Sequence, residues 1–249
     1  MKKILITGAS SGFGKAIAEK FASSGFELII TGRREEMLSE LKEELILKYN
    51  VKITVLVFDV QNKKKTFDVL QDNPILEDLD ILVNNAGLAL GRDLFDEANL
   101  DDWETMIDTN VKGLLYVTKA VLPNFIKRGL GHIINIGSTA GKEVYERGNV
   151  YCATKMSVDA LSQAMRIDLL RHKIKVTVIH PGAADTEFST VRFKGDKQKA
   201  SAVYEGYTPL YGADIADTVH YTAHLPPHVC INSIVMTCLA QANSFYLFK

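Results

Sequence analysis

Short apolar segments alternate along this chain with longer segments in which apolar residues recur every three or four positions. The longer segments predict helices, among them Glu35–Lys48, Asp101–Lys127, Tyr151–Arg171 and one that begins at Lys15. Several short segments are apolar at successive positions, as strands covered on both faces must be. This order predicts an α/β fold of the Rossmann type, a doubly wound parallel sheet with helices on both faces. The short segments, rich in β-branched residues, predict strands at Ile4–Thr7, Leu28–Thr31, Ile53–Phe58, Ile81–Val83, His132–Ile136, Val176–Ile179 and Ile231–Met236.

No linker, internal repeat or low-complexity segment interrupts the alternation, so we expect a single domain over residues 1–249. The least regular part is residues 183–209, which is polar and contains Gly195, Gly206 and Pro209. A long irregular segment inside a compact domain is usually functional or disordered. We therefore expect a substrate lid at about 183–209.

Composition narrows the possible partners and the compartment. The chain is 47% hydrophobic and 24% charged, with a formal net charge of −1, which provides no attraction for nucleic acid or an anionic membrane. We interpret the run Lys63-Lys64-Lys65 as a solvated helix start rather than a binding patch. The apolar run after Met1-Lys2-Lys3 is too short for a signal peptide, and no segment approaches transmembrane length. The 3 cysteines and 6 histidines have no disulfide or metal-site spacing, so we expect a cytoplasmic protein without a metal.

A glycine-rich loop joins the first predicted strand to the first predicted helix. Glycines in such a loop allow a tight turn, the approach of backbone N–H groups to a pyrophosphate, and close packing of helix on strand. The N-terminus of the helix adds unpaired donors and a partial positive charge. The loop therefore predicts a dinucleotide site that includes Gly8, Ser10, Ser11, Gly12, Phe13 and Gly14.

The end of the second strand indicates which dinucleotide is bound. An NAD site usually places an acid here to hold the ribose 2′-hydroxyl, whereas an NADP site places a cation for the 2′-phosphate. This chain has no acid at that point but carries Arg33 and Arg34. Arginine suits a phosphate because its planar fork donates two parallel, charge-assisted hydrogen bonds. We expect NADP, with Arg33 the stronger candidate; the alternative is that both side chains only face solvent.

Two further segments follow predicted strands. Asp59-Val60 comes after the third strand, and Asn84-Asn85-Ala86-Gly87 comes after the fourth. Ligands of open α/β sheets bind at the carboxyl ends of the strands, so we assign Asp59, Val60, Asn85, Ala86 and Gly87 to the cofactor site. The second string is also compatible with a simple turn.

Tyr151 and Lys155 lie four residues apart on one face of a predicted helix. An unperturbed phenol, with a pKa of about 10, is a poor base at neutral pH, and a neighbouring cation lowers that pKa. The pair therefore indicates a proton-transfer group. Ser138, just after the fifth strand, and Asn110, within the helix Asp101–Lys127, give the pair its context.

Together these motifs resemble the short-chain dehydrogenase/reductase family over nearly the whole chain. They are Thr7-Gly8-x-x-x-Gly12-x-Gly14, Asn84-Asn85-Ala86-Gly87, Asn110, Ser138, Tyr151-x-x-x-Lys155, and Pro181-Gly182 with Thr186.

The resemblance implies a role for each of these residues. Tyr151 would exchange the proton with the alcohol or carbonyl, and Lys155 would lower its pKa and bind the nicotinamide ribose. Ser138 would hold the reacting oxygen, and Asn110 a water that links Lys155 to solvent. Pro181, Gly182 and Thr186 would line the nicotinamide end.

Within the family, longer strings resemble the bacterial NADP-dependent 3-hydroxy acid dehydrogenases, also described as serine or L-allo-threonine dehydrogenases. These strings span residues 84–91, 102–110, 131–141 and 186–196. This resemblance implies oxidation of a small hydroxy acid at its 3-hydroxyl, or reduction of malonic semialdehyde, by a homotetramer.

A carboxylate substrate needs a cation in its pocket. Arg192 and Lys194 on the expected lid are the candidates, unless they are only exposed charges, and Arg147 is a third. The chain departs from the resemblance at Ala183-Ala184-Asp185, at Glu146-Arg147 and over Ser244–Lys249, all near the substrate side. We interpret the apolar tail as interface or core packing rather than a membrane contact. The alternatives are a reductase of neutral ketones, aldehydes or sugars, and a non-catalytic NADP sensor.

Overall fold

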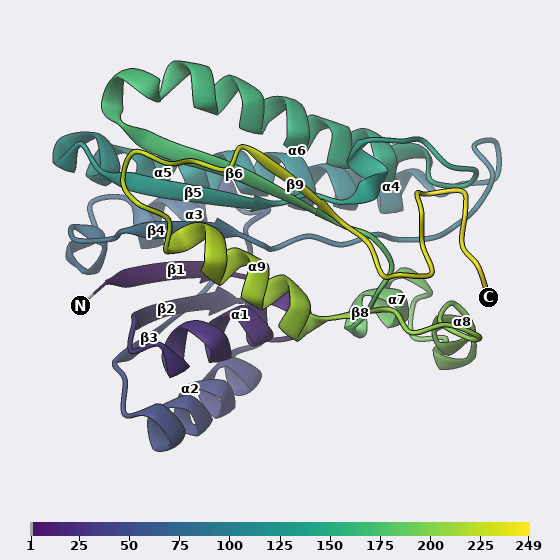
Figure 1. Cartoon of the computed structure of the whole chain (residues 1–249), viewed down its shortest axis with the longest axis horizontal. Coiled ribbons are helices and arrows are strands. Elements are labelled where there is room, and N and C mark those ends of the chain that lie inside the picture. The colour runs from purple at the N-terminus through teal and green to yellow at the C-terminus, as the bar shows by residue number, and fades with distance from the viewer. Residues whose placement is uncertain (1) are drawn as a thin grey trace.

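A seven-stranded parallel sheet forms the centre of the computed structural model, which describes residues 2–249 (Figure 1). Its strand order is β3-β2-β1-β4-β5-β6-β9, so the chain winds outward in both directions from β1 and β4. All neighbouring pairs are parallel, which places the carboxyl ends of the strands at one edge. The strands are β1 (Lys3–Thr7), β2 (Glu27–Gly32), β3 (Ile53–Val57), β4 (Ile81–Asn84), β5 (Gly131–Ile136), β6 (Ile174–Pro181) and β9 (Ser233–Met236).

Successive residues of a strand face opposite sides of the sheet, and here both sides are apolar. Ile4 and Ile6 belong to the core on one side, and Leu5 belongs to the core on the other. All three are completely buried. The unbroken apolar character of the strands therefore comes from two helical layers, as the sequence predicts.

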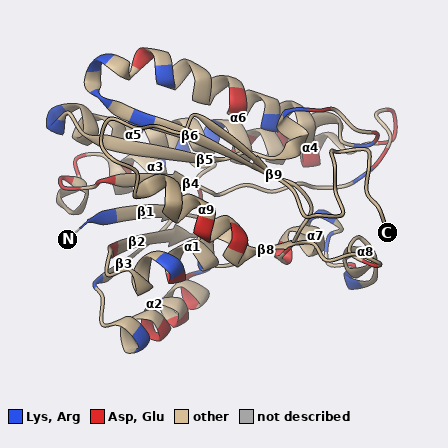
Figure 2. Ribbon diagram, viewed as in Figure 1, with Lys and Arg blue, Asp and Glu red and all other residues tan. Residues whose placement is uncertain are grey.

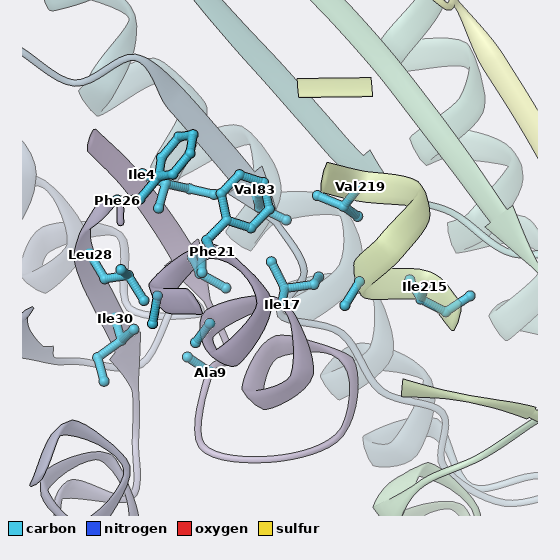
Figure 3. Close-up of a cluster of buried hydrophobic side chains, with 14 of the residues drawn as sticks. Ile4, Ala9, Ile17, Phe21, Phe26, Leu28, Ile30, Val83, Ile215 and Val219 are labelled. Carbon is cyan, nitrogen blue, oxygen red and sulfur yellow. The ribbon is translucent and has the colours of Figure 1, made fainter. Parts of the chain in front are cut away.

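One layer consists of α1 (Gly12–Ser23), α2 (Glu35–Tyr49) and α9 (Gly212–Ala223). In Figure 3, Ile17 and Phe21 of α1 lie between the sheet and Val219 of α9. The other layer consists of α3 (Lys63–Leu70), α4 (Leu100–Ile107), α5 (Leu114–Arg128) and α6 (Asn149–Asp168). Charged residues lie mainly on the helices and loops around the sheet (Figure 2).

Two predicted helices differ from the structure in their course. The single helix expected over Asp101–Lys127 is divided into α4 and α5 by a π-helical turn, Asp108–Gly113. A Cβ on Gly113 would lie 2.7 Å from Cγ2 of Val60, so the turn packs directly on the loop after β3. Such turns within α-helices often occur at functional sites. The helix expected over Tyr151–Arg171 ends at Asp168 and is followed by a 3₁₀ turn, Leu170–His172.

The segment expected to be an irregular lid is instead largely ordered into short elements. It contains β7 (Ala184–Asp185), α7 (Glu187–Arg192) and α8 (Lys197–Ala202), and β8 (Leu210–Tyr211) follows it. β7 pairs in parallel with β8 outside the main sheet. No helix within residues 2–249 is long and apolar enough to cross a membrane.

Candidate active site

Two adjoining cavities lie at the carboxyl ends of the strands. The first, of about 280 Å³, is lined by the glycine-rich loop and by residues that follow β2, β3 and β4. The second, of about 240 Å³, is lined by Ser138, by the segment after β6 and by α7. Together they fall within the size range of a typical small-molecule site. The cavities share five lining residues, namely Phe13, Gly137, Tyr151, Thr186 and Phe188.

The first cavity brings together most of the residues predicted to bind the cofactor. Those that line it are Gly8, Ser10, Ser11, Gly12, Phe13, Arg33, Arg34, Asp59, Val60, Asn85, Ala86, Gly87, Tyr151, Lys155 and Thr186. Pro181 and Gly182 line the second cavity instead, as do Ser138 and Arg192. The predicted site therefore divides into a dinucleotide part and a second part, and Tyr151 belongs to both.

The glycine-rich loop has the geometry that a pyrophosphate cradle requires. Gly8 and Gly12 have φ angles of +66° and +53°, a region that residues with a Cβ rarely adopt. A Cβ on Gly14 would lie 2.6 Å from Nδ2 of Asn85, so only glycine allows α1 to pack this closely. Ser11 does not cap α1 through its side chain, which leaves the first amides of the helix for an anion.

Asn85 and Thr7 connect the ends of two strands beneath this loop. Nδ2 of Asn85 donates to the carbonyl oxygen of Thr7 at 2.8 Å and to that of Gly8 at 3.2 Å. Oγ1 of Thr7 accepts from the amides of Asn85 and Ala86 at 3.0 and 2.9 Å. The string after β4 is therefore more than a turn, because it fixes the loop that lines the cavity.

The two arginines after β2 have different surroundings. Arg34 donates to Oγ of Ser11 at 2.7 Å and to Oγ of Ser10 at 3.1 Å, and it pairs with Glu187 of α7 at 3.1 Å. Nη1 of Arg33 lies 3.7 Å from a carboxylate oxygen of Asp59, and its side chain is 62% exposed. Both line the first cavity. Arg34, the weaker candidate from the sequence, makes the closer contacts with the loop and with α7.

Tyr151 is 7% exposed and faces both cavities from the first turn of α6. Burial raises its pKa, as does the nearby phenol of Tyr145, while a hydrogen bond with Ser138 and the charge of Arg192 oppose the rise. Oγ of Ser138 accepts from the amide of Ala140 at 3.1 Å, which leaves its own proton for a further acceptor. The phenol is therefore protonated at neutral pH, and a hydroxyl and a cation are in place to stabilise its anion.

Lys155 is 6% exposed, and burial lowers its pKa to about 8. Its Nζ donates to the carbonyl oxygen of Ile136 at 2.9 Å. A Cβ on Gly87 would lie 3.5 Å from that Nζ, so the ammonium faces the cavity beside the loop after β4. The cation that affects the Tyr151 pKa in this arrangement is Arg192, so the expected effect of Lys155 on the phenol stays a prediction.

Asn110 lies in the π-helical turn and is 2% exposed. Its side chain accepts from the amide of Leu88 and donates to the carbonyl oxygen of Leu88, both at 2.8 Å. A further donation reaches Oγ1 of Thr154 at 3.0 Å. Asn110 thus joins the loop after β4 to Thr154 of α6, the residue that precedes Lys155. Its expected hydrogen bond to a water stays a prediction.

Of the three cations proposed for a substrate carboxylate, only Arg192 lines either of these two cavities. Its guanidinium donates to the carbonyl oxygen of Gly91 and to Oη of Tyr145, at 3.3 and 3.2 Å. Lys194 pairs with Asp102 at 2.8 Å and lines neither cavity. Arg147 also lies outside both, near Glu146 and with a φ angle of +63°.

Several lining residues were not predicted from the sequence. They come from turns and from the C-terminal segment, where neither periodicity nor a motif marks them. Hydrogen bonding reveals one such contact, since Oε1 of Gln241 accepts from the amide of Ala183 at 2.8 Å. The residues of the second cavity found only in the structure include Arg92, Tyr145, Val203, Tyr204, Gln241 and Ser244.

Comparison with known proteins agrees with this geometry. The model of the short-chain dehydrogenase family matches residues 2–197. This chain belongs to that family. It is therefore an oxidoreductase, and two of its motif residues, Tyr151 and Thr186, lie where the two cavities meet.

Two curated relatives and one solved structure match almost the whole chain. The NADP-dependent 3-hydroxy acid dehydrogenase of Salmonella typhi is 48% identical over 241 residues, which cover 96% of each protein. Sulfoacetaldehyde reductase 2 of Chromohalobacter salexigens is 45% identical over 98% of this chain and 96% of its own. The closed form of serine dehydrogenase complexed with NADP⁺ has a TM-score of 0.92 and 46% identity, with 97% of each chain covered.

Proposed function

We propose that this short-chain dehydrogenase is NADP-dependent and transfers hydride between the nicotinamide and the 3-hydroxyl of a small hydroxy acid, or reduces malonic semialdehyde. The observation that carries the proposal is the position of Tyr151. Its phenol lies between a cavity with a pyrophosphate cradle and a cavity bordered by Arg192. A proton carrier at that junction reaches a substrate oxygen in one cavity beside a nicotinamide in the other. The dehydrogenase from Salmonella typhi and the serine dehydrogenase structure support both the cofactor and the substrate class.

The lining of the first cavity supports NADP as its ligand. The Gly8–Gly14 loop and the N-terminus of α1 would hold the pyrophosphate, and Arg33 and Arg34 the 2′-phosphate. Asp59 and Val60 would border the adenine. Thr186, where the cavities meet, and Pro181 and Gly182, which line the second cavity, would border the nicotinamide. Bound NADP supplies or accepts the hydride.

The chain itself supplies the proton chemistry. Tyr151 takes the proton from the substrate hydroxyl during oxidation, or returns it to the carbonyl oxygen during reduction. Ser138 donates a hydrogen bond to that oxygen and so holds it against the phenol. Lys155 stabilises negative charge on the phenol and binds the nicotinamide ribose, and Asn110 holds the water that connects Lys155 to solvent.

Arg192 supports the choice of a carboxylate substrate. Its guanidinium lies within 4.0 Å of no carboxylate oxygen in residues 2–249, although it is partly buried. A half-buried cation without an acidic partner favours the binding of an anion. We assign Arg192 to the substrate carboxylate. Because Arg192 belongs to α7, this contact would hold α7 over the bound substrate.

The remaining expectations concern assembly and compartment. We propose one catalytic domain over residues 1–249, with its lid at 183–209, that assembles as a cytoplasmic homotetramer. Exposed apolar side chains at the end of α6 and just after it support an interface, since Ile167 is 75% and Leu170 74% exposed.

A substrate screen tests the proposal directly. Reduction of NADP⁺ is followed by absorbance with serine, allo-threonine, 3-hydroxybutyrate, 3-hydroxyisobutyrate and neutral alcohols of the same carbon number. We expect kcat/KM for the hydroxy acids to exceed that for the neutral alcohols by about a hundredfold, the value of a good charge-assisted contact. Equal or greater turnover of neutral alcohols would instead favour a reductase of neutral carbonyl compounds.

A second candidate reaction is the reduction of an aldehyde that carries a sulfonate. Arg92 also lines the second cavity and, like Arg192, has no carboxylate oxygen within 4.0 Å among the residues described. Two arginines suit a sulfonate, which presents three oxygens. The sulfoacetaldehyde reductase from Chromohalobacter salexigens supports this candidate. Sulfoacetaldehyde and malonic semialdehyde compared side by side with NADPH would decide between the two.

A further inference from the structure

A buried group of ionisable side chains lies directly behind Ser138. His180, the residue of β6 that precedes Pro181, is completely buried. Its Nδ1 lies 3.0 Å from the carbonyl oxygen of Ser138, and its Nε2 lies 3.3 Å from Oδ1 of Asp159 on α6. The other oxygen of Asp159 accepts from Nζ of Lys142 at 2.9 Å.

These contacts form one network of side chains beside the active site. Lys142 follows the 3₁₀ turn Thr139–Gly141 that Ser138 begins, and Asp159 lies one helical turn beyond Lys155. The network thus joins three segments: the one that carries Ser138, the one that carries the Tyr151–Lys155 pair, and the one expected at the nicotinamide end. A Cβ on Gly137 would lie 2.7 Å from Nδ1 of His180, so the imidazole packs tightly on this turn.

His180 has two hydrogen-bond acceptors beside it but, when neutral, only one proton to donate. Both neighbours of the imidazole, a carbonyl and a carboxylate, only accept hydrogen bonds. A neutral imidazole has one proton and can satisfy only one of them. Nε2 of His180 has no hydrogen-bond partner among residues 2–249, despite the carboxylate nearby. This geometry favours the tautomer with its proton on Nδ1, which then donates to the Ser138 carbonyl.

From this arrangement we propose that His180 is a positioning residue. Its Nδ1–H holds the Ser138 carbonyl and thereby keeps the Ser138 hydroxyl against the reacting oxygen, while the Lys142–Asp159 pair determines where the ring proton resides. The charge of Asp159 attracts that proton to Nε2, and the ammonium of Lys142 reduces the attraction. This inference rests on the proposed function, because Ser138 acts only in that reaction.

Acid adds a second effect. An imidazole that carries both protons donates to both acceptors at once, so protonation of His180 strengthens its hydrogen bond to the Ser138 carbonyl. Burial lowers the pKa of His180, as does the charge of Lys142, whereas the Ser138 carbonyl and Asp159 act in the opposite direction. Lys142 and Asp159 are the charged groups that affect the ring, and burial prevails, so His180 is neutral at pH 7 and its tautomer matters there.

Two substitutions separate the hydrogen bond from the space that the ring fills. His180→Asn retains an N–H donor near the position of Nδ1, and His180→Leu fills a similar volume with no donor. We expect His180→Leu to lower kcat by about tenfold or more, as displacement of a catalytic group does. His180→Asn should stay within about threefold of the parent, with the NADP dissociation constant unchanged in both. Equal losses in both variants, at unchanged thermal stability, would overturn the proposal.

A spectroscopic measurement tests the tautomer without reference to activity. Protein labelled with ¹⁵N-histidine is observed at pH 7 through long-range ¹H–¹⁵N correlations, and the His180 signals are those missing from His180→Asn. We expect a protonated Nδ1 and an unprotonated Nε2. A proton on Nε2 alone would refute the inference even if every substrate were turned over. Absence of turnover in the parent with Nδ1 protonated would count against the proposed function and not against this contact.

Discussion

The guanidinium of Arg192 lies over the ring of Tyr151, with its Cζ 5.5 Å from the ring centroid. It stands in the same way over Tyr145, at 5.8 Å. A cation over an aromatic face is attracted by the ring, and here it also favours the phenolate. One side chain of α7 therefore acts on the Tyr151 phenol and, in the proposed reaction, would also bind the carboxylate of the substrate.

Substitution of Arg192 should affect acids far more than neutral substrates. We expect Arg192→Gln to raise KM for a hydroxy acid by about 10- to 100-fold, because a hydrogen bond to a charged group is lost. Steady-state kinetics with hydroxy acids and neutral alcohols provide the measurement. Lys194→Gln is the matched control, since Lys194 pairs with Asp102 outside the cavities, and its kinetics should stay close to the parent's. The same rise in KM for neutral alcohols would remove the carboxylate role.

Removal of the Tyr151 hydroxyl should abolish turnover while cofactor binding survives. Tyr151→Phe retains the ring that packs 5.6 Å from that of Phe188, so we expect a folded protein. Loss of the acid/base should lower kcat by about 10³-fold, and fluorescence titration should give an unchanged NADPH dissociation constant. Turnover near the parent's rate in this variant would mean that another group carries the proton.

The two arginines after β2 should distinguish NADP from NAD, and Arg34 should matter more than Arg33. Arg34→Ala should raise the NADP dissociation constant by about 10- to 100-fold and leave that of NAD nearly unchanged. Arg33→Ala should have a smaller effect, because the Arg33 side chain is more exposed and lies near Asp59. Calorimetric titration with both nucleotides measures the difference, and Arg147→Ala serves as a control outside the cavities. A parallel loss of NAD affinity would exclude a contact with the 2′-phosphate.

Stability should fall in acid because of His132, which is 6% exposed on β5 and bonds to Oγ1 of Thr177 at 2.8 Å. Burial lowers its pKa to about 3, whereas an unfolded histidine has a value of about 6.5. Below pH 6.5, His132 therefore binds a proton in the unfolded chain but stays neutral in the folded chain. This contribution is complete above that pH and decreases as pH falls towards 3.

Between pH 7 and pH 5 this single group should lower the free energy of unfolding by about 2 kcal/mol. Urea unfolding at the two pH values, for the parent and for His132→Gln, isolates the contribution. The substitution can destabilise the protein at both values, so the quantity of interest is the difference between pH 7 and pH 5. A difference as large in His132→Gln as in the parent would assign the acid sensitivity to other groups.

The sequence predicted the seven main strands and most of the first cavity for local reasons. Strands such as β1 and β5 are rich in β-branched residues, and the residues that follow them lie at a common edge because the sheet is parallel. The helix α9 was not among the predicted segments, and the lid was expected to be irregular. The π-helical turn around Asn110 could not be foreseen, because it depends on packing against Val60 and on a hydrogen bond to Leu88, both distant in sequence.

The sequence by itself determined the alternation of strands and helices, the glycine-rich loop and the family, since these depend on neighbouring residues and fixed spacings. Only the tertiary structure decided which charged side chains meet. It placed Arg192 over Tyr151, assigned Lys194 to Asp102, directed Lys155 to the Ile136 carbonyl and put His180 behind Ser138. Such pairings join segments tens of residues apart, and no periodicity encodes them, because they result from the packing of whole elements.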